Sequence, residues 1–132
     1  VHIVDIGARM GGNLIGSHII PTGTGIDYMG NMIRAAVGDE TNWKPEWQPR
    51  PIATKLLALS PGKVKKLPDF DEISVRYDVQ IEHHLHVGDT ITPYRTNLDG
   101  CGYVVARDID VDLSMALAAD VRKVIDDSIV RE

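Results

Sequence analysis

The residues with the clearest chemical potential lie near the start of the chain, between Asp5 and Asn13. Asp5 stands in an apolar run, and a buried carboxylate is costly unless it is paired, hydrogen-bonded or bound to a metal. Arg9 follows four residues later, and Gly11 and Gly12 come next. Adjacent glycines let the backbone approach a ligand closely and direct its N–H groups at an anion. This spacing predicts a site for Mg²⁺ and for a phosphate or carboxylate group.

Two short elements would position these residues. The apolar residues of 1–6 predict a buried strand that carries the acid. Residues 13–21 predict a short helix or turn that Pro21 stops. Ser17 and His18 lie in this segment and could face a substrate, although a packed, hydrogen-bonded helix residue is the commoner role for such a histidine.

A second helix is predicted after a Thr-Gly-Thr-Gly loop at residues 22–25. It would begin near Ile26, with Thr24 or Asp27 as its cap, and end at Gly38. Its apolar residues follow helical spacing, which is typical of a face that packs in a core. These residues are Ile26, Met29, Met32, Ile33, Ala36 and Val37.

The stretch Asp-Ile-Gly-Ala-Arg-Met-Gly-Gly at residues 5–12 resembles the last catalytic motif of the ATP-grasp ligases, usually Glu-Ile-Asn-x-Arg-x-Gly-Gly. In that family an apolar helix usually follows, and then a Thr-Gly-x-Asp step into a second helix. Thr-Gly-Ile-Asp at residues 24–27 stands at that place. The Gly-Ala-Arg variant and the segments after residue 50 are most similar to the L-amino acid ligase branch. Relatives of the carbamoyl phosphate synthase and biotin carboxylase types are the alternatives.

The resemblance implies a role for each motif residue. Asp5 would hold Mg²⁺, and Arg9 would hold the transferring phosphate and the acyl-phosphate intermediate. The loop of residues 11–13 would lie on the substrate side. Asp5 replaces the usual Glu, and Gly7 replaces the usual Asn, so the resemblance carries over only one metal ligand to this stretch.

The resemblance implies the activity of a carboxylate–amine ligase that acts on amino acids. ATP would phosphorylate a carboxylate, and an amine would then attack the acyl phosphate. The nucleotide-cradling lysines and the glycine-rich flap of the family are not recognisable in the chain. We therefore expect a C-terminal fragment, inactive alone, of an enzyme whose N-terminal part lies upstream. The alternative from another class is a non-catalytic assembly or substrate-recognition module, with a second copy pairing along the strand at residues 1–6.

Composition limits the other possibilities. The chain has 132 residues, with 43% hydrophobic and 25% charged residues, which is typical of one ordinary globular domain. Its net charge of −5, with only two Trp and one Phe, argues against nucleic-acid binding. No apolar run has membrane-spanning length and no secretory signal is visible. The single cysteine, Cys101, excludes an internal disulfide and favours a reducing, cytoplasmic location.

The predicted fold class is α+β. Residues 1–38 would be the end of an ATP-grasp domain, a strand plus helices, and the Pro- and Trp-rich residues 39–50 a linker. Residues 51–132 would form a subdomain with a small mixed or antiparallel sheet, one short helix and one long C-terminal helix. Strands are expected at 52–59, 63–67, 79–87 and 103–107, and helices from Pro68 and over 112–130.

For three further features, a structural role is favoured over a functional one. Glu82, His84 and His86 would share one face of a strand, where they could hold a metal, but a solvated or interface strand is favoured. Cys101 lies between two glycines and is expected to be a buried thiol in a tight turn. The lysines of residues 63–66 are expected to protect an exposed edge strand.

Overall fold

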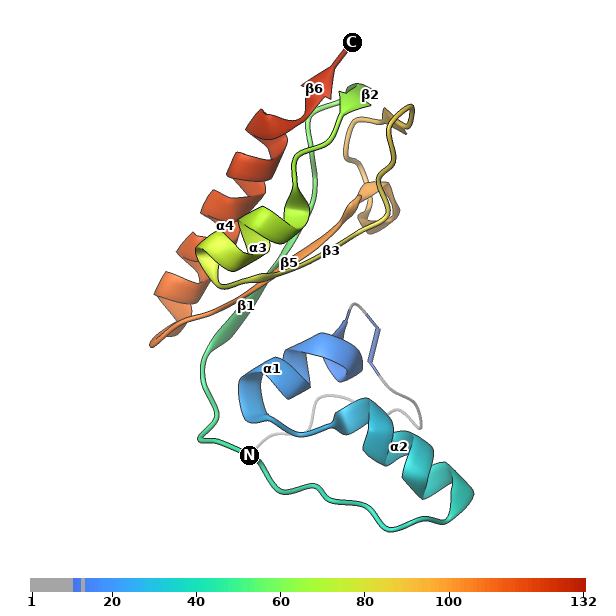
Figure 1. Cartoon of the computed structure of the whole chain (residues 1–132), viewed down its shortest axis with the longest axis vertical. Coiled ribbons are helices and arrows are strands. Elements are labelled where there is room, and N and C mark those ends of the chain that lie inside the picture. Colours follow the sequence, from blue (N-terminus) through green and yellow to red (C-terminus); the bar gives the residue numbers. More distant parts are fainter. Residues whose placement is uncertain (1–10, 13) are drawn as a thin grey trace. The chain divides into compact units, whose positions relative to one another are not determined.

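The computed structural model describes residues 11, 12 and 14–132. Contacts divide the chain into two compact units, Val1–Pro49 and Arg50–Glu132, which are described separately below (Figure 1). The strand expected over residues 1–6 lies outside the described residues. The described part contains no helix whose length and apolarity would allow it to cross a membrane.

The first unit begins with a π-helical turn, η1 (Ile15–Ile19), that continues into the helix α1 (Ile20–Thr24). The prediction that Pro21 stops the helix was wrong, and so was the loop predicted at residues 22–25. Pro21 lies in the first turn of α1, where its fixed φ suits the helix, and α1 ends only at Gly25, with φ +73°.

The second helix of this unit, α2 (Tyr28–Val37), begins two residues later than predicted and ends at the expected Gly38. Asp27 is its cap, because the Asp27 carboxylate accepts a 2.8 Å hydrogen bond from the Gly30 N–H. Thr24 has another role, since its hydroxyl donates to the Ile20 carbonyl at 2.7 Å. Gly38 has a φ of +82°, the left-handed conformation that ends many helices.

The buried face of α2 is polar. Asn31 is only 1% exposed, and its side chain donates to the Asn42 carbonyl at 2.6 Å and accepts from the Asn42 N–H at 2.9 Å. The ring of Trp43 makes an edge-to-face contact with Tyr28, with 5.6 Å between centroids. The segment after α2 is therefore held against the helix by Asn42 and Trp43.

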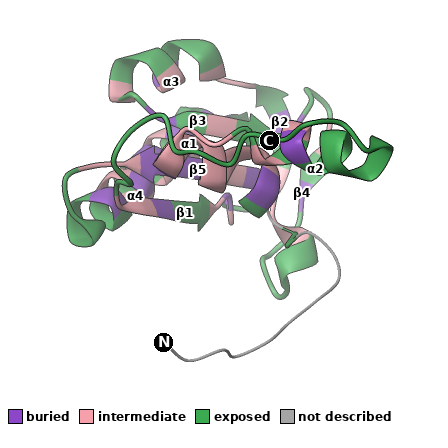
Figure 2. Ribbon diagram, turned by 90° about the horizontal axis from the view of Figure 1, so that it is seen from below, coloured by how far each residue is buried: buried purple, intermediate pink, exposed green. Residues whose placement is uncertain are grey.

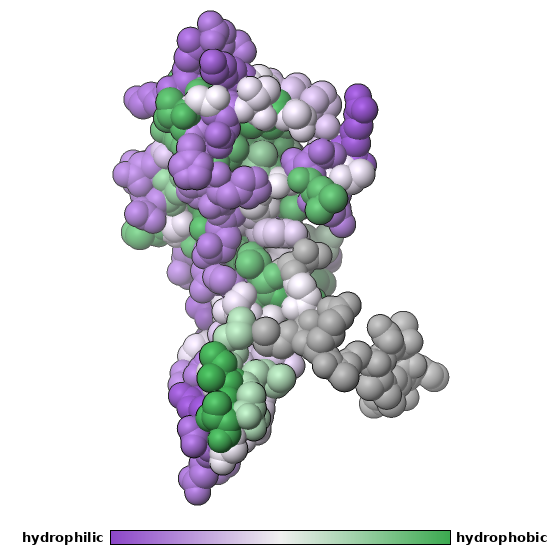
Figure 3. All heavy atoms as spheres, turned by 90° about the vertical axis from the view of Figure 1, so that its right-hand side faces the viewer, coloured by the Kyte–Doolittle hydropathy of each residue, from purple (hydrophilic) through white to green (hydrophobic). Residues whose placement is uncertain are grey.

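The core role predicted for the apolar residues of α2 was wrong. Their side chains are largely exposed, and they form a hydrophobic surface that Figure 3 shows on the lower part of the molecule. The exposed fractions are 36% for Met29, 37% for Met32, 60% for Ile33 and 68% for Val37. Helical spacing predicted an apolar stripe correctly, but not whether this chain covers it.

The second unit contains a three-stranded antiparallel sheet in the order β1-β5-β3. Ala53 pairs with Ala106, and Ile81 pairs with Val104. A smaller sheet has the order β4-β2-β6. The α+β class is confirmed. The elements are β1 (Ile52–Leu56), β2 (Gly62–Lys66), α3 (Phe70–Tyr77), β3 (Gln80–His83), β4 (Thr90–Ile91), the 3₁₀ turn η2 (Asn97–Asp99), β5 (Gly102–Arg107), α4 (Val111–Ser128) and β6 (Val130–Arg131).

Helix α4 has the predicted cap, since the Asp110 carboxylate accepts from the Leu113 N–H at 2.8 Å. Its buried stripe is partly different from the predicted one, because Leu113 is 44% exposed and Ser114 is fully buried instead. The Ser114 hydroxyl lies 2.8 Å from the Asp110 carbonyl oxygen and accepts from the Asp108 N–H at 3.0 Å. Because its hydroxyl is hydrogen-bonded, Ser114 can be buried, and it therefore takes the place of Leu113 on the buried face of α4. The helix ends at Ser128, and Val130 belongs to β6.

Two strand predictions were wrong in detail. The strand expected over residues 79–87 ends at His83, whose pairing with Gly102 is the last between β3 and β5, and the chain turns further on at Gly88, with φ +100°. β2 is not an edge strand, since it lies between β4 and β6. The lysines of β2 are exposed on a central strand, and Lys65 pairs with Glu132 at 2.9 Å.

The core of the second unit lies between the larger sheet and α4 (Figure 2). Its completely buried side chains come from both elements, from β2 and from the residue that follows β1. They include Leu57, Val64, Val104, Val121 and Ile125. Because α4 forms one side of this core and is the last long element of the chain, the core can form only when the whole unit is present.

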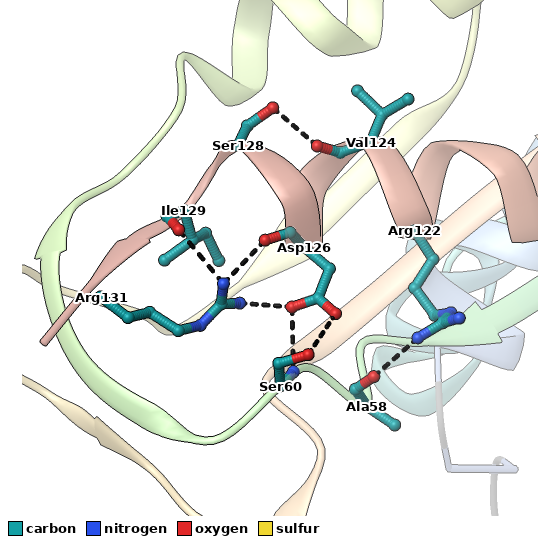
Figure 4. A network of polar contacts seen from close by, with 8 residues as sticks. All are labelled: Ala58, Ser60, Arg122, Val124, Asp126, Ser128, Ile129 and Arg131. Atoms are coloured by element: carbon teal, nitrogen blue, oxygen red, sulfur yellow. Dashed lines mark hydrogen bonds and ion pairs between the residues drawn. The ribbon is translucent and has the colours of Figure 1, made fainter.

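A polar network joins the end of α4 and the C-terminal strand β6 to the segment that follows β1 (Figure 4). The Asp126 carboxylate accepts from the Ser60 N–H at 2.9 Å and from the Ser60 hydroxyl at 2.8 Å, and it pairs with the Arg131 guanidinium. Arg131 also donates to the Asp126 carbonyl at 2.8 Å, and Arg122 donates to the Ala58 carbonyl at 2.8 Å. The contacts of Asp126 with Ser60 and of Arg122 with Ala58 join residues that are more than sixty positions apart.

Candidate functional site

Only part of the predicted site lies within the described residues. Asp5, Arg9 and Asn13 lie outside them, so their predicted roles stay predictions. Gly11, Gly12, Ser17 and His18 are described, all in the first unit.

The glycine pair is exposed. A Cβ added to Gly12 would have no heavy atom of the described residues within 4 Å, whereas a Cβ on Gly11 would lie 2.9 Å from the Cδ1 of Ile15. The Gly12 carbonyl accepts from the Ile15 N–H at 3.2 Å. The backbone at Gly12 is thus accessible to a ligand, while Gly11 packs against the turn that follows.

The turn after the glycines has an unusual backbone. Leu14 has φ +65° and ψ 8°, a left-handed conformation that is uncommon for a residue other than glycine. The Leu14 carbonyl accepts from the His18 N–H at 2.9 Å and from the Ile19 N–H at 3.0 Å, and the second bond defines the π turn η1. Single π turns and strained residues occur frequently at functional sites.

Ser17 and His18 are half-buried on this turn. His18 Nδ1 lies 2.7 Å from Ser17 Oγ, a hydrogen bond whose direction depends on the histidine tautomer. The structure therefore brings both residues together, as a hydrogen-bonded pair close in sequence to the glycines. Such a pair can bind a polar substrate group. The same hydrogen bond is also expected of a histidine with a purely structural role in a helix.

A polar hollow of about 400 Å³ in the first unit was missed by the sequence analysis. It lies between the start of α2 and the segment that follows the helix. The Arg34 guanidinium lies 3.2 Å from the Asp27 carboxylate and 3.3 Å from the Asn31 side-chain oxygen, and Lys44 and Glu46 also line the hollow. No local pattern in the sequence indicates it, because its walls come from a helix and an irregular segment.

The histidines of the second unit do not converge. His83 stacks on Phe70, with ring centroids 3.7 Å apart, and burial lowers the pKa of His83, with a smaller contribution from the nearby His86 charge. Glu82, His84 and His86 are exposed. Within the described ranges, no group of three or more His, Cys, Asp or Glu residues is arranged to hold a metal ion.

Cys101 is a buried thiol, as predicted, with 6% exposure. It lies at a hollow of about 300 Å³ that Thr90, Leu98 and Asp99 also line. Burial raises the pKa of the Cys101 thiol, which disfavours the nucleophilic thiolate. The Asp99 carboxylate accepts from the Arg95 and Thr96 N–H groups, and these hydrogen bonds lower the Asp99 pKa and fix the adjacent loop.

Comparisons with known proteins support the resemblance to the ATP-grasp ligases. The family model for the L-amino acid ligase C-terminal domain 2 matches residues 55–127. No curated protein matches the chain.

Two solved structures of ATP-grasp enzymes share the fold. A phosphoribosylglycinamide synthetase from Anaerococcus prevotii superposes with a TM-score of 0.68 at 16% identity, over 94% of this chain and 31% of that one. An L-amino acid ligase from Bacillus licheniformis also has a TM-score of 0.68, at 20% identity, over 96% of this chain and 33% of that one. The chain thus spans about a third of the length of the structures that it matches.

Proposed function

The chain belongs to the family of the L-amino acid ligase C-terminal domain 2, and from this premise we propose that it is the C-terminal part of an ATP-dependent carboxylate–amine ligase. The family match over residues 55–127 is the observation that carries the proposal. The substrates we propose are amino acids, one supplying the carboxylate and the other the amine. The likeness to two ATP-grasp enzymes supports the same class through the fold.

The proposed reaction proceeds through an acyl phosphate. The carboxylate substrate takes the terminal phosphoryl group of ATP, and the amine then displaces phosphate from the acyl carbon. Charge accumulates on phosphoryl and carbonyl oxygens during both steps, so the protein contributes mainly by positioning and by charge neutralisation. Arg9 is the residue that we assign to the phosphoryl oxygens, because its guanidinium can hold two of them at once.

The loop of residues 11–13 is proposed to hold the substrate carboxylate or the oxyanion that forms from it. The exposure of Gly12 supports this assignment, because no side chain of the described residues lies within 4 Å of where its Cβ would be, so a ligand could approach the backbone closely there. Ser17 and His18 are proposed to contact the same substrate through their hydroxyl and imidazole groups. Their 2.7 Å hydrogen bond keeps the two polar groups together on η1.

Mg²⁺ would neutralise the phosphates of ATP when it is bound. The described residues alone do not fit such a site, since they contain no suitable group of three or more metal-binding side chains. Asp5 lies outside the described part, and further ligands would have to come from the rest of the ligase. We therefore expect the chain by itself to bind MgATP poorly and to be inactive, with the upstream part of the ligase as its partner.

The test uses the intact ligase that contains this chain, with phosphate release measured on pairs of amino acids and hydroxylamine added to trap an acyl phosphate as a hydroxamate. Arg9→Ala should lower turnover by orders of magnitude and abolish the hydroxamate. Gly12→Ala should keep the fold, because its Cβ meets no heavy atom of the described residues within 4 Å, but should reduce turnover. Arg76→Ala is the matched control, since Arg76 is exposed on α3.

The results separate the proposal from its alternatives. Near-normal turnover of Arg9→Ala would refute the role of Arg9. Phosphate release that requires bicarbonate, with no response to amino acids, would place the protein instead with the carbamoyl phosphate synthase or biotin carboxylase types.

A non-catalytic assembly module is the second candidate, because the apolar residues of α2 form an exposed surface (Figure 3). Sedimentation of the chain should then show a dimer that Ile33→Glu dissociates. A monomer at all concentrations would argue against self-assembly through α2.

A further inference from the structure

The hollow beside Cys101 lies within the second unit. Its volume of about 300 Å³ is at the lower end of the range for sites that hold small molecules. Three stretches line it, namely residues 84–85 after β3, residues 89–92 around β4 and residues 98–101 before β5. It shares no residue with the ligase site proposed for the first unit, so its chemistry can be considered separately.

The buried part of this lining is apolar. Leu85, Ile91 and Cys101 belong to the hydrophobic core, and none of them is more than 6% exposed. The Cys101 thiol is therefore more than nine-tenths buried, and it makes no hydrogen bond within the described part of the chain. An apolar group that enters the hollow would leave water for contact with these three side chains, which is favourable.

Two half-buried carboxylates, Asp89 and Asp99, also line the hollow. Asp89 Oδ2 accepts from the His86 N–H at 2.8 Å. Asp99 Oδ2 accepts from the Arg95 N–H at 3.0 Å and from the Thr96 N–H at 2.8 Å. Within residues 14–132, the Oδ1 atom of each carboxylate accepts no hydrogen bond. Each acid thus fixes its own loop through one oxygen and keeps the other for a ligand.

Backbone hydrogen bonds hold the lining in place. The Cys101 N–H donates to the Leu57 carbonyl at 3.0 Å, and the Cys101 carbonyl accepts from the His84 N–H at 3.2 Å. The Asp89 carbonyl accepts from the Val64 N–H at 2.8 Å. A ligand therefore meets a preorganised site and does not have to order the loops around it.

The charge of the lining favours a cation. Neither lysine nor arginine occurs among the described residues that line the hollow. Arg131 acts on Cys101 from outside the lining, but it is already paired with Asp126. The Thr96 and Arg95 N–H groups are the main causes of the lowered Asp99 pKa, and the Arg95 charge is the smallest cause. The two carboxylates therefore give the hollow a negative potential.

We propose that this hollow binds a small organic ammonium ion, a primary amine with a short apolar chain. The chain packs against Leu85, Ile91 and Cys101, and the ammonium group, with its three donors, pairs with the carboxylates of Asp89 and Asp99. An α-amino acid carries a carboxylate beside its ammonium group, which both acids would repel. The ligand thus differs from the substrates of the proposed reaction, and the inference goes beyond the proposed function without depending on it.

The experiment is a titration of the isotopically labelled 132-residue chain with n-butylammonium chloride, followed by NMR at neutral pH. The ligand should shift the amides of residues 84–85, 89–92 and 98–101 and leave those of α2 unchanged. Nuclear Overhauser effects should connect the butyl chain to the methyl groups of Leu85 and Ile91. Sodium chloride at the same concentration is the control for ionic strength.

Three related compounds each change one property of the ligand. L-Norvaline is butylammonium with a carboxylate on the carbon that bears the nitrogen, 1-butanol has the chain without the charge, and methylammonium has the charge without the chain. Each should bind about tenfold more weakly than butylammonium. This series uses the unmodified chain, so its result does not depend on whether a variant folds.

Two variants assign the ammonium contacts. Asp89→Asn and Asp99→Asn remove a charge but keep a side-chain oxygen that can accept from the loop N–H groups. The double variant should bind butylammonium about tenfold more weakly than the unmodified chain, and no better than it binds 1-butanol. Asp71→Asn is the matched control, because Asp71 is exposed in the first turn of α3.

Absence of shifts around the hollow at high butylammonium concentration would overturn the inference. Equal binding of L-norvaline or 1-butanol would overturn it as well, because the carboxylates would then have no part in recognition. Equal binding of methylammonium would remove the role of the apolar side chains and reject the proposed ligand class. The ligase assay gives a separate answer, since this titration requires neither ATP nor Arg9.

Discussion

Replacing Asp126 by Asn should destabilise the second unit more than any surface change of the same size. The Asp126 side chain is 17% exposed, and its Arg131 partner is 16% exposed. The carboxylate accepts from both the N–H and the hydroxyl of Ser60 (Figure 4). An amide in its place presents N–H groups toward at least one of these donors and leaves the Arg131 charge without its counter-ion.

The magnitude follows from this burial. Removing one partner of a buried ion pair costs about 3–5 kcal/mol, because the remaining charge stays desolvated. Since both side chains keep some contact with water, we expect the lower end, about 3 kcal/mol. Small domains have a total stability of about 5–15 kcal/mol, so the loss should be easy to measure.

The assay is urea denaturation of the full chain followed by circular dichroism, with the free energy of unfolding extrapolated to water. Glu72→Gln is the control, because its pair with Arg76 is more than 60% exposed on both sides and should contribute less than about 1 kcal/mol. A loss below about 1 kcal/mol for Asp126→Asn would refute the reasoning.

A double variant tests the proposed cause of the destabilisation rather than its magnitude. The Arg131 Nε is buried without a hydrogen-bond partner among the described residues, so the network is not fully satisfied. Asp126→Leu combined with Arg131→Met should therefore recover much of the stability that Asp126→Leu alone loses. An equal or greater loss in the double variant would show that the charge of Arg131 is not the source of the cost.

Three further predictions concern single positions. Gly102→Ala should prevent β5 from pairing normally, because its Cβ would lie 1.9 Å from the Glu82 carbonyl oxygen; an unchanged melting temperature would contradict this. Asn31→Ala should cost about 1–3 kcal/mol in the first unit by leaving the Asn42 backbone groups unpaired, and faster amide exchange at Asn42 should report it. His83 has a folded-state pKa below 6.5, so its share of stability is complete above about pH 6.5 and falls as the pH drops toward that lower value. Unfolding measured against pH should show this loss, and His83→Gln should reduce it; the same pH dependence in both proteins would exclude His83 as its source.

The ends of helices could be predicted from the sequence because they depend on local chemistry. Gly38 ends α2 in a left-handed conformation, and Asp110 caps α4 through a hydrogen bond to the third residue beyond it. Burial was less predictable, since it depends on what the rest of the molecule supplies. The apolar face of α2 is exposed, and Ser114 is buried because three of its neighbours in space provide hydrogen bonds.

The sheet could not be derived in full for the same reason. The alternation that predicted a strand through Val87 continues past the point where β3 loses its partner, because only pairing with β5 decides where the strand ends. The central place of β2 depends on the residues of β6, far along the chain. The π turn at Ile15–Ile19 likewise has no sequence pattern, although the glycines before it indicated where to look.

The ligase proposal has two supports that come from different parts of the chain. The motif at residues 5–12 belongs to the first unit and lies outside the range 55–127 that matches the family model. The family match therefore does not derive from the motif, and either support could fail without the other. Arg9→Ala tests the first support through turnover of the intact ligase. The second is tested in the same assay by whether phosphate release responds to amino acids.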